Sequence, residues 1–290
     1  MTADHDTPGA SSPSGTSVRD ALDSAVGAIA AARSDTPRLD AELLLANVLG
    51  VGRERLLRDP DLRVAGAAVR EFQDAVRRRA VEHEPVAYII GERSFRRIEL
   101  AVDRRALIPR PETELLVEAG LGLPAGARVL DLGTGSGAVA LALKDERPDL
   151  HVSGSDISVD ALELARLNAE LLRLDVHWWH ADLLPADVEF TAVLCNPPYI
   201  ADSERSLLSP SILRHEPPLA LFAGADGLAV IRPLLAQIAQ RPQIRFLALE
   251  VGAGQAATVA ELVRRAGFDA VRFERDLARI QRVVIAERHG

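Results

Sequence analysis

The chain has 290 residues, of which 48% are hydrophobic and 26% are charged. This mixture is typical of a globular protein, so it excludes a wholly disordered chain, and the length suffices for two domains or one large one. With 34 basic and 42 acidic residues the formal net charge is −8, which disfavours strong binding to nucleic acid or an anionic membrane through bulk charge.

The chain has one cysteine, Cys195, which excludes an internal disulfide framework and a metal site built from several cysteines. His177 and His180 could ligate zinc only together with further ligands at suitable spacing, which the sequence does not show, so we expect no bound metal. No apolar stretch is long enough to span a bilayer, and the acidic residues 1–6 are unlike a secretory signal. These features predict a cytoplasmic protein without membrane contact.

The first part of the chain predicts a tail followed by helices. Residues 1–16 are rich in Ser, Pro, Gly and Thr and are predicted to be a disordered tail. In residues 17–86 apolar side chains such as Val18, Leu22 and Ile29 recur at helical spacing. With no strand pattern between them, these helices predict a small bundle.

The second part predicts an α/β domain. Residues 87–110 change to an alternating pattern, which predicts a linking β-hairpin, and residues 111–290 alternate between strand and helix patterns. The expected strands are residues 128–132, 151–156, 176–179, 191–195, 244–250, 270–273 and 279–286, and the expected helices are residues 136–145, 158–172, 227–239 and 255–266. Such alternation predicts a mostly parallel seven-stranded sheet covered on both faces, with its ligand beyond the carboxyl ends of the strands.

A glycine-rich motif, Asp131-Leu132-Gly133-Thr134-Gly135-Ser136-Gly137, follows the first of these strands and opens a helix. Glycines at this point allow a tight turn and a close approach of the backbone to a ligand. Because a looser dinucleotide pattern also fits, the glycines alone do not choose a cofactor.

Two acids follow the next two strands. Asp156 ends the second strand, where a carboxylate can accept hydrogen bonds from both ribose hydroxyls. Asp182 and its neighbour Leu183 follow the third strand and could hold an adenine amino group and the face of its ring.

A second motif, Asn196-Pro197-Pro198-Tyr199, follows the fourth strand. Two prolines stiffen the backbone and donate no hydrogen bond. The turn therefore exposes two acceptors, the side-chain oxygen of Asn196 and the carbonyl of Pro197, to which a planar NH2 group can donate both hydrogens. Tyr199 could pack its ring against the substrate.

Together the two motifs resemble class I, Rossmann-like methyltransferases, which use S-adenosylmethionine to methylate planar amino groups. Further segments narrow the resemblance to the HemK/PrmC family: residues 39–45, 107–114, 216–217, 226–228 and 250–255. That family methylates the side-chain amide nitrogen, N5, of the glutamine in the Gly-Gly-Gln motif of peptide chain release factors, and so modulates translation termination. Residues 107–114 (Leu-Ile-Pro-Arg-Pro-Glu-Thr-Glu) are the more specific marker.

The resemblance also implies roles for individual residues. Cofactor contacts are implied for Asp131, Gly133, Thr134, Gly135, Ser136, Gly137, Asp156, Asp182, Leu183 and Asn196. Asn196, Pro197, Pro198 and Tyr199 would hold the glutamine amide, with Asn196, Pro197 and Tyr199 as the catalytic residues. Two positions depart from the family: Leu183 stands where some members have tryptophan, and Val251 where histidine is common. The helical residues 17–86 would recognise the release factor, and a monomer is expected.

Three other functions remain open from the sequence. A nucleic-acid amino methyltransferase of the adenine-N6 type would use the same Asn-Pro-Pro-Tyr motif, but the acidic balance argues against it. A non-catalytic nucleotide-binding module or a nicotinamide dehydrogenase would leave that motif unexplained. Cys195 is expected to be a buried strand-end residue, and Trp178 and Trp179 are interpreted as core or pocket rim, with His177 and His180 partly exposed.

Overall fold

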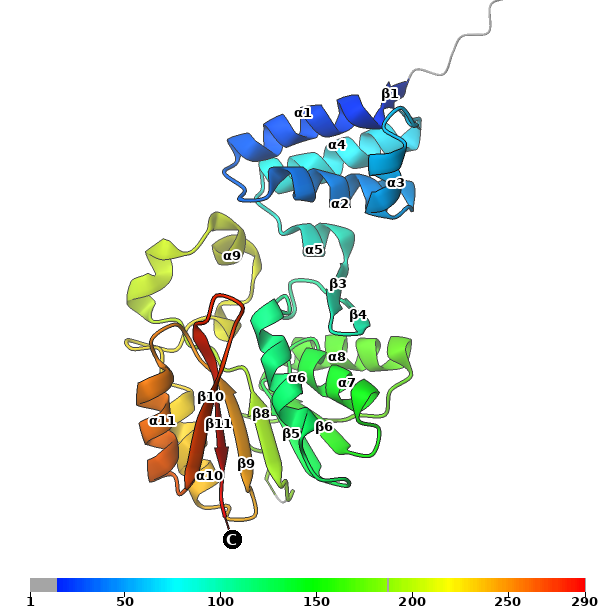
Figure 1. Cartoon of the computed structure of the whole chain (residues 1–290). Helices are drawn as coiled ribbons and strands as arrows, with labels where there is room; N and C mark the ends of the chain where they lie inside the picture. The colour runs from blue at the N-terminus through cyan, green and yellow to red at the C-terminus, as the bar shows by residue number, and fades with distance from the viewer. Residues whose placement is uncertain (1–14, 187, 290) are drawn as a thin grey trace, which may run out of the picture. The chain divides into compact units, whose positions relative to one another are not determined.

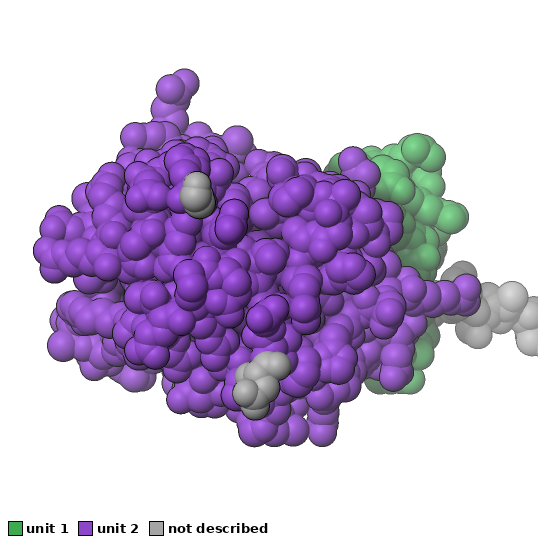
Figure 2. All heavy atoms as spheres, turned by 90° about the horizontal axis from the view of Figure 1, so that it is seen from below, with its two compact units in different colours: residues 1–90 green, residues 91–290 purple. Residues whose placement is uncertain are grey.

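The computed structural model describes residues 15–186 and 188–289, and the chain forms two compact units, residues 1–90 and residues 91–290 (Figure 2). Residues 1–14 of the predicted tail lie outside the described residues. The last two residues of that tail differ from the prediction. Gly15 and Thr16 lie in strand β1 (Gly15–Ser17), which pairs antiparallel with β2 (Arg63–Ala65). Amino-acid composition carries no information about pairing with a distant strand, so it does not separate Gly15 and Thr16 from the tail.

Helices make up most of the first unit (Figure 1). They are α1 (Val18–Ala31), α2 (Pro37–Leu49), α3 (Arg53–Arg58), α4 (Ala67–Ala80) and α5 (Val86–Ile90). The apolar residues at helical spacing form one core, in which Val18, Leu22 and Ile29 are completely buried. The predicted bundle is thus present, with the short β1–β2 ladder added to it.

Three consecutive arginines on α4 each have an acidic partner in the same unit. The ion pairs are Arg77 with Asp74 and Glu82, Arg78 with Glu84, and Arg79 with Asp40. Arg79 and Asp40 are largely buried, and Asp40 also accepts from the hydroxyls of Ser34 and Thr36 at the start of α2. The positive charges of this run are therefore balanced within the bundle.

Of the residues 87–110 predicted as a hairpin, β3 (Glu92–Phe95) and β4 (Ile98–Ala101) pair antiparallel, whereas residues 87–90 belong to helix α5 instead. Arg96 in the turn donates to the carboxylate of Glu146 at 2.5 and 2.9 Å. Because Glu146 belongs to the helix that follows the glycine motif, this contact holds the hairpin within the second unit.

The second unit contains the predicted seven-stranded sheet (Figure 1). Its strands are β5 (Arg128–Leu132), β6 (His151–Asp156), β7 (His177–His180), β8 (Ala192–Cys195), β9 (Phe246–Glu250), β10 (Ala270–Arg275) and β11 (Gln281–Glu287). The order is β10-β11-β9-β8-β5-β6-β7, parallel from β9 to β7, with β11 antiparallel to both of its neighbours. This confirms the mostly parallel α/β architecture.

Helices cover both faces of this sheet (Figure 1). The helices of the second unit are α6 (Glu114–Leu121), α7 (Ala138–Glu146), α8 (Val159–Leu172), α9 (Pro210–His215), α10 (Ile231–Ala239) and α11 (Ala256–Arg265), of which α9 lies beyond the end of the sheet and not on its faces; short 3-10 turns are η1 (Pro111–Thr113), η2 (Asp202–Leu207) and η3 (Pro218–Ala220). From β5 the chain continues to β6 and β7 on one side of β5, and it later returns to β8 on the other side of β5. Because such crossovers are right-handed, α7 and α8 lie on one face of the sheet and α10 lies on the opposite face. In the described residues no helix has the length and apolar character needed to cross a membrane.

The strand order creates a switch point between β5 and β8, where parallel α/β sheets bind ligands. Leu132 and Cys195, the last residues of these strands, are paired in register. The two motifs begin immediately after them. As a result Gly133 and Asn196 lie side by side, with the Asn196 carbonyl 3.8 Å from the place a Cβ on Gly133 would occupy.

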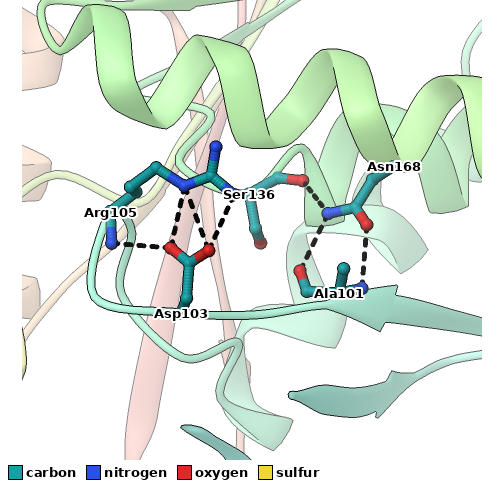
Figure 3. Close-up of polar contacts among 5 residues, drawn as sticks. All are labelled: Ala101, Asp103, Arg105, Ser136 and Asn168. Carbon is teal, nitrogen blue, oxygen red and sulfur yellow. Dashed lines mark hydrogen bonds and ion pairs between the residues drawn. The ribbon is translucent and has the colours of Figure 1, made fainter.

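Asn168 on α8 connects the hairpin to the glycine motif (Figure 3). Its side chain is completely buried. Oδ1 accepts from the Ala101 N–H at 2.8 Å, and Nδ2 donates to the carbonyls of Ala101 and Ser136 at 3.0 and 2.9 Å. One side chain thus satisfies three backbone groups from two segments.

Replacing Asn168 with alanine is expected to destabilise the second unit by at least about 3 kcal/mol, because it leaves three backbone groups without this partner at about 1–3 kcal/mol each. Urea unfolding measures the loss. Glu170→Ala, at an exposed position of the same helix, serves as the control and is expected to change stability by less than about 0.5 kcal/mol. Equal stability of the two variants would contradict this account of Asn168.

Candidate active site

The glycine motif forms the turn between β5 and α7. Gly133, Gly135 and Gly137 all have positive φ angles, at which any other residue would be strained. The N–H groups of Gly133 and Thr134 donate to the Ser155 carbonyl on β6, at 2.8 and 2.9 Å. The turn is therefore held against the neighbouring strand.

Asp131 supports the turn from inside the sheet. Its Oδ2 accepts from the Thr134 hydroxyl at 2.5 Å and from the Ala140 N–H of α7 at 3.0 Å. The residue is 2% exposed, and burial raises its pKa to about 7, while the bond from Thr134 acts against that rise. These bonds hold the turn and the first turn of α7 together.

Asp156 lies at the end of β6 beside the glycine turn. Its Oδ2 accepts from the Gly135 N–H and its Oδ1 from the Ser158 N–H, both at 2.9 Å. Burial is the main reason that its pKa is raised. A carboxylate oxygen can accept more than one hydrogen bond, so Asp156 can still receive hydroxyl donors from a ligand.

Trp178 on β7 packs behind the glycine motif. A Cβ on Gly137 would lie 3.1 Å from its ring, and a Cβ on Gly154 would overlap that ring. Its neighbour Trp179 is half-buried, and His177 and His180 on either side are exposed. This agrees with the interpretation of the tryptophans as packing residues.

The Asn-Pro-Pro-Tyr turn lies across the switch point from the glycine motif. Asn196 donates from Nδ2 to the Thr113 hydroxyl at 3.1 Å. The Tyr199 hydroxyl donates to Glu250 Oε1 at 3.4 Å. Burial raises the pKa of the Tyr199 phenol well above its usual value, so Tyr199 remains protonated and can act only as a neutral donor or acceptor.

Gln255 holds the backbone of the same turn. Its Nε2 donates to the Tyr199 carbonyl at 3.0 Å, and its Oε1 accepts from the Gly252 N–H at 2.9 Å. Gly227 lies against the same carbonyl, with no room for a Cβ. Gln255 and Gly227, both distant in sequence, thus fix the position of Tyr199, the last residue of the turn.

Most of the predicted site residues line one cavity of about 250 Å³. Those on its wall are Asp131, Gly133, Thr134, Gly135, Ser136, Asp156, Asp182, Leu183, Asn196, Pro197 and Pro198. Leu183 reaches the wall with a left-handed backbone, φ +67°. Gly137 and Tyr199 are not among the lining residues: Gly137 packs against Trp178, and the Tyr199 hydroxyl points to Glu250.

Several site residues carried no functional prediction. Thr113 contacts Asn196, and Arg110 of the same segment donates to buried Glu216 at 2.5 Å, which joins residues 107–114 to residues 216–217 on the cavity wall. Both segments are part of the family resemblance, but only the folded structure reveals that they meet. Within residues 15–186 and 188–289, no three His, Cys, Asp or Glu side chains are arranged to hold a metal ion.

The sheet order, with a glycine turn and an Asn-Pro-Pro-Tyr turn at its switch point, is that of a Rossmann-like methyltransferase. Solved structures share this fold. A methyltransferase from Pyrococcus furiosus is 16% identical, with a TM-score of 0.50 over 66% of this chain and 89% of that chain. The hMettl16 catalytic domain in complex with MAT2A 3'UTR hairpin 6 is also 16% identical, with a TM-score of 0.54 over 66% of this chain and 76% of that chain.

Sequence comparison gives the particular family. Residues 20–91 match the PrmC N-terminal domain, and residues 111–216 match the methyltransferase small domain. The release factor glutamine methyltransferase of Deinococcus radiodurans is 39% identical over 94% of this chain and 99% of its own length, and that of Cereibacter sphaeroides is 43% identical over 92% and 97%. The chain belongs to the release factor glutamine methyltransferase family, which confirms the resemblance to HemK/PrmC proteins.

Proposed function

We propose that this protein transfers a methyl group from S-adenosylmethionine to the side-chain amide nitrogen, N5, of the glutamine in the Gly-Gly-Gln motif of peptide chain release factors. The observation that carries the proposal is the position of Asn196 and Pro197 on the wall of the same cavity as the glycine motif. Family membership supports both the cofactor and the substrate.

The residues present fit the proposed cofactor. Gly135 leaves the backbone open to a ligand, since a Cβ there would meet only Ala106 at 3.7 Å. Asp156 offers carboxylate oxygens to the ribose hydroxyls, and Asp182 and Leu183 offer a polar and an apolar contact to the adenine. When bound, S-adenosylmethionine supplies a methyl group on a positively charged sulfur.

The chain's own residues prepare the amide nitrogen for transfer. An amide nitrogen is a poor nucleophile because its lone pair is delocalised into the carbonyl. Asn196 Oδ1 and the Pro197 carbonyl accept its two hydrogens, which favours a less planar and more electron-rich nitrogen and fixes its direction. Positioning of this kind supplies much of the rate enhancement, and the proton can leave after transfer without a strong general base.

The helical part of the chain, residues 17–86, is proposed to recognise the release factor, with catalysis in residues 111–290 and the hairpin region 87–110 between them. A cavity of about 250 Å³ holds small groups only, whereas specific protein recognition needs a much larger surface. We further propose a monomer without strong nucleic-acid binding, as the net charge of −8 favours. Because release factors act in translation, we place it in the cytoplasm.

One assay tests the proposal against its alternatives. The protein is incubated with methyl-labelled S-adenosylmethionine and, in parallel, with purified release factor, tRNA or DNA, and the label is located by mass spectrometry. We expect label on the release factor, on the glutamine of Gly-Gly-Gln. Label on tRNA or DNA instead would favour a nucleic-acid amino methyltransferase, and no transfer to any of them would favour a binding module.

Asp156→Asn is expected to weaken binding of S-adenosylhomocysteine by about tenfold or more, because the charged acceptor of the ribose hydroxyls is lost. Isothermal titration calorimetry measures the affinity. Asp160→Asn removes the same charge at an exposed position in the first turn of α8 and is expected to keep the affinity of the wild type. If both variants bind equally well, Asp156 does not hold the ribose.

A further inference from the structure

A second hollow, of about 480 Å³, lies at the amino ends of three strands, whereas the candidate active site lies at their carboxyl ends. Arg128, His151, Ser153, His177 and Trp179 line this second hollow. Three of them are the first residues of β5, β6 and β7. Among the described residues the second hollow shares no lining residue with the cavity of the candidate active site, so the two are separate.

The register of the sheet brings four of these side chains together. Arg128 on β5 pairs with His151 on β6, and Ser153 on β6 pairs with His177 on β7. His151 and Ser153 are two residues apart on one strand and therefore point to the same face of the sheet. Because neighbouring strands lie about 4.8 Å apart, donors on these three strands can reach one small ligand.

This face of the sheet is open where these residues lie. In most parallel α/β sheets a helix follows each strand and covers a face. Here the described residues of the link between β7 and β8, 181–186 and 188–191, contain no helix. Arg128, His151 and His177 are exposed, so their side chains are accessible to a ligand from solvent.

No acidic side chain balances these donors within the part of the chain that the structure describes. There Arg128, His151 and His177 have no ion pair, and the hydroxyl of Ser153 has no hydrogen bond. A guanidinium, an imidazole N–H and a hydroxyl can all donate hydrogen bonds to an anion. In a chain whose formal net charge is −8, this group of unpaired donors indicates an anion site.

Trp179 provides an aromatic surface beside the donors. It follows His177 by two residues on the same face of β7, and the centroids of their rings are 4.4 Å apart. The tryptophan is half-buried, so part of its ring borders the second hollow. Such a surface can stack on a flat ring that is attached to the anion.

We propose that the second hollow is a further ligand site, which binds a phosphate group through Arg128, His151, Ser153 and His177. A phosphate presents oxygens in several directions and so suits donors from three strands, whereas a carboxylate can be satisfied by one guanidinium alone. The phosphate is either free or part of a nucleotide, whose base then contacts Trp179. This proposal does not depend on the reaction proposed above.

Titration with inorganic phosphate, followed by NMR of the histidine rings, tests the site. The full-length protein is saturated with S-adenosylhomocysteine, which fills the cavity of the candidate active site, and pH and ionic strength are held constant. We expect saturable shifts of the His151 and His177 rings with a Kd on the order of 1 mM, and no shift of the other histidines. The absence of saturable shifts at about ten times that concentration would overturn the proposal.

Arg128→Gln is expected to weaken phosphate binding by about tenfold or more, because a charge-assisted hydrogen bond is lost. Arg166→Gln removes an exposed arginine on α8 and should keep the affinity of the wild type. His151→Gln provides a second variant, for which a weaker affinity is also expected. Wild-type kcat for release factor methylation would show that each variant is folded. The proposal fails if Arg128→Gln and His151→Gln both bind phosphate as tightly as Arg166→Gln.

Cytidine monophosphate and cytidine, titrated in the same way, distinguish the two sources of phosphate. Tighter binding of cytidine monophosphate than of inorganic phosphate, with a shift of the Trp179 indole resonance, would identify a nucleotide as the ligand. Equal affinity would identify free phosphate. If cytidine binds as tightly as cytidine monophosphate, the site does not recognise phosphate, and the proposal is wrong.

Discussion

Asn196→Ala is expected to lower kcat for release factor methylation by about 10²–10³, the usual cost of losing one preorganised polar contact to the reacting group. The variant keeps the turn formed by the two prolines and the Pro197 carbonyl, but it loses one of two acceptors for the glutamine NH2. Single-turnover assays with labelled S-adenosylmethionine measure the rate directly.

The accompanying control is cofactor affinity. Asn196 occupies only one side of a cavity whose other contacts come from the glycine motif and Asp156, so binding of S-adenosylhomocysteine is expected to fall much less than kcat. A variant that turns over at the wild-type rate would remove Asn196 from the reaction. A loss confined to cofactor binding would give it a different role.

Gly227→Ala is expected to lower kcat by about 10²-fold, the scale of effect produced by displacing a positioned group by about 1 Å. A Cβ at this position overlaps the carbonyl of Tyr199, which is also held by Gln255. Because both groups belong to backbone, the overlap can be relieved only if the Gly227 segment or the Asn-Pro-Pro-Tyr turn moves, and we expect a shift of the turn that presents Asn196 and Pro197. The effect should appear in kcat, measured in the same assay.

Gly126→Ala provides a matched control for Gly227→Ala. Both glycines have φ +73°, so both alanine variants carry a backbone strain of about 1–2 kcal/mol. A Cβ on Gly126 meets no atom within 4 Å, and this residue precedes β5 at the end of the strand opposite the cavity. Gly126→Ala should therefore lose stability but retain wild-type kcat. Equal activity of the two variants would show that the turn tolerates the displacement.

The scaffold could be predicted from the sequence because its signals are local. The strands at residues 128–132 and 151–156 have the predicted bounds, and Ser158 caps α8 as expected, accepting from the Ala161 N–H. Two helix starts were wrong: α7 begins at Ala138 and α10 at Ile231, later than predicted. In both cases a glycine with positive φ, Gly137 or Gly227, stands before the helix and is needed there for close packing.

The site could be predicted where its residues are contiguous, and not where they meet across the sheet. Asn196, Pro197 and Pro198 lie next to one another in the chain and reach the cavity together. Thr113 lies 83 residues from Asn196, and their contact exists only because the fold brings η1 beside the end of β8. A hydroxyl or a carboxylate without a local partner carries no pattern that would reveal its role.

The most direct test of the central claim is a crystal structure of the protein with S-adenosylhomocysteine and a Gly-Gly-Gln peptide. The account predicts that the glutamine amide nitrogen lies within about 3.2 Å of both Asn196 Oδ1 and the Pro197 carbonyl, with Asn196 Nδ2 still on Thr113. A glutamine amide bound elsewhere, or one that offers its carbonyl oxygen to this turn, would contradict it.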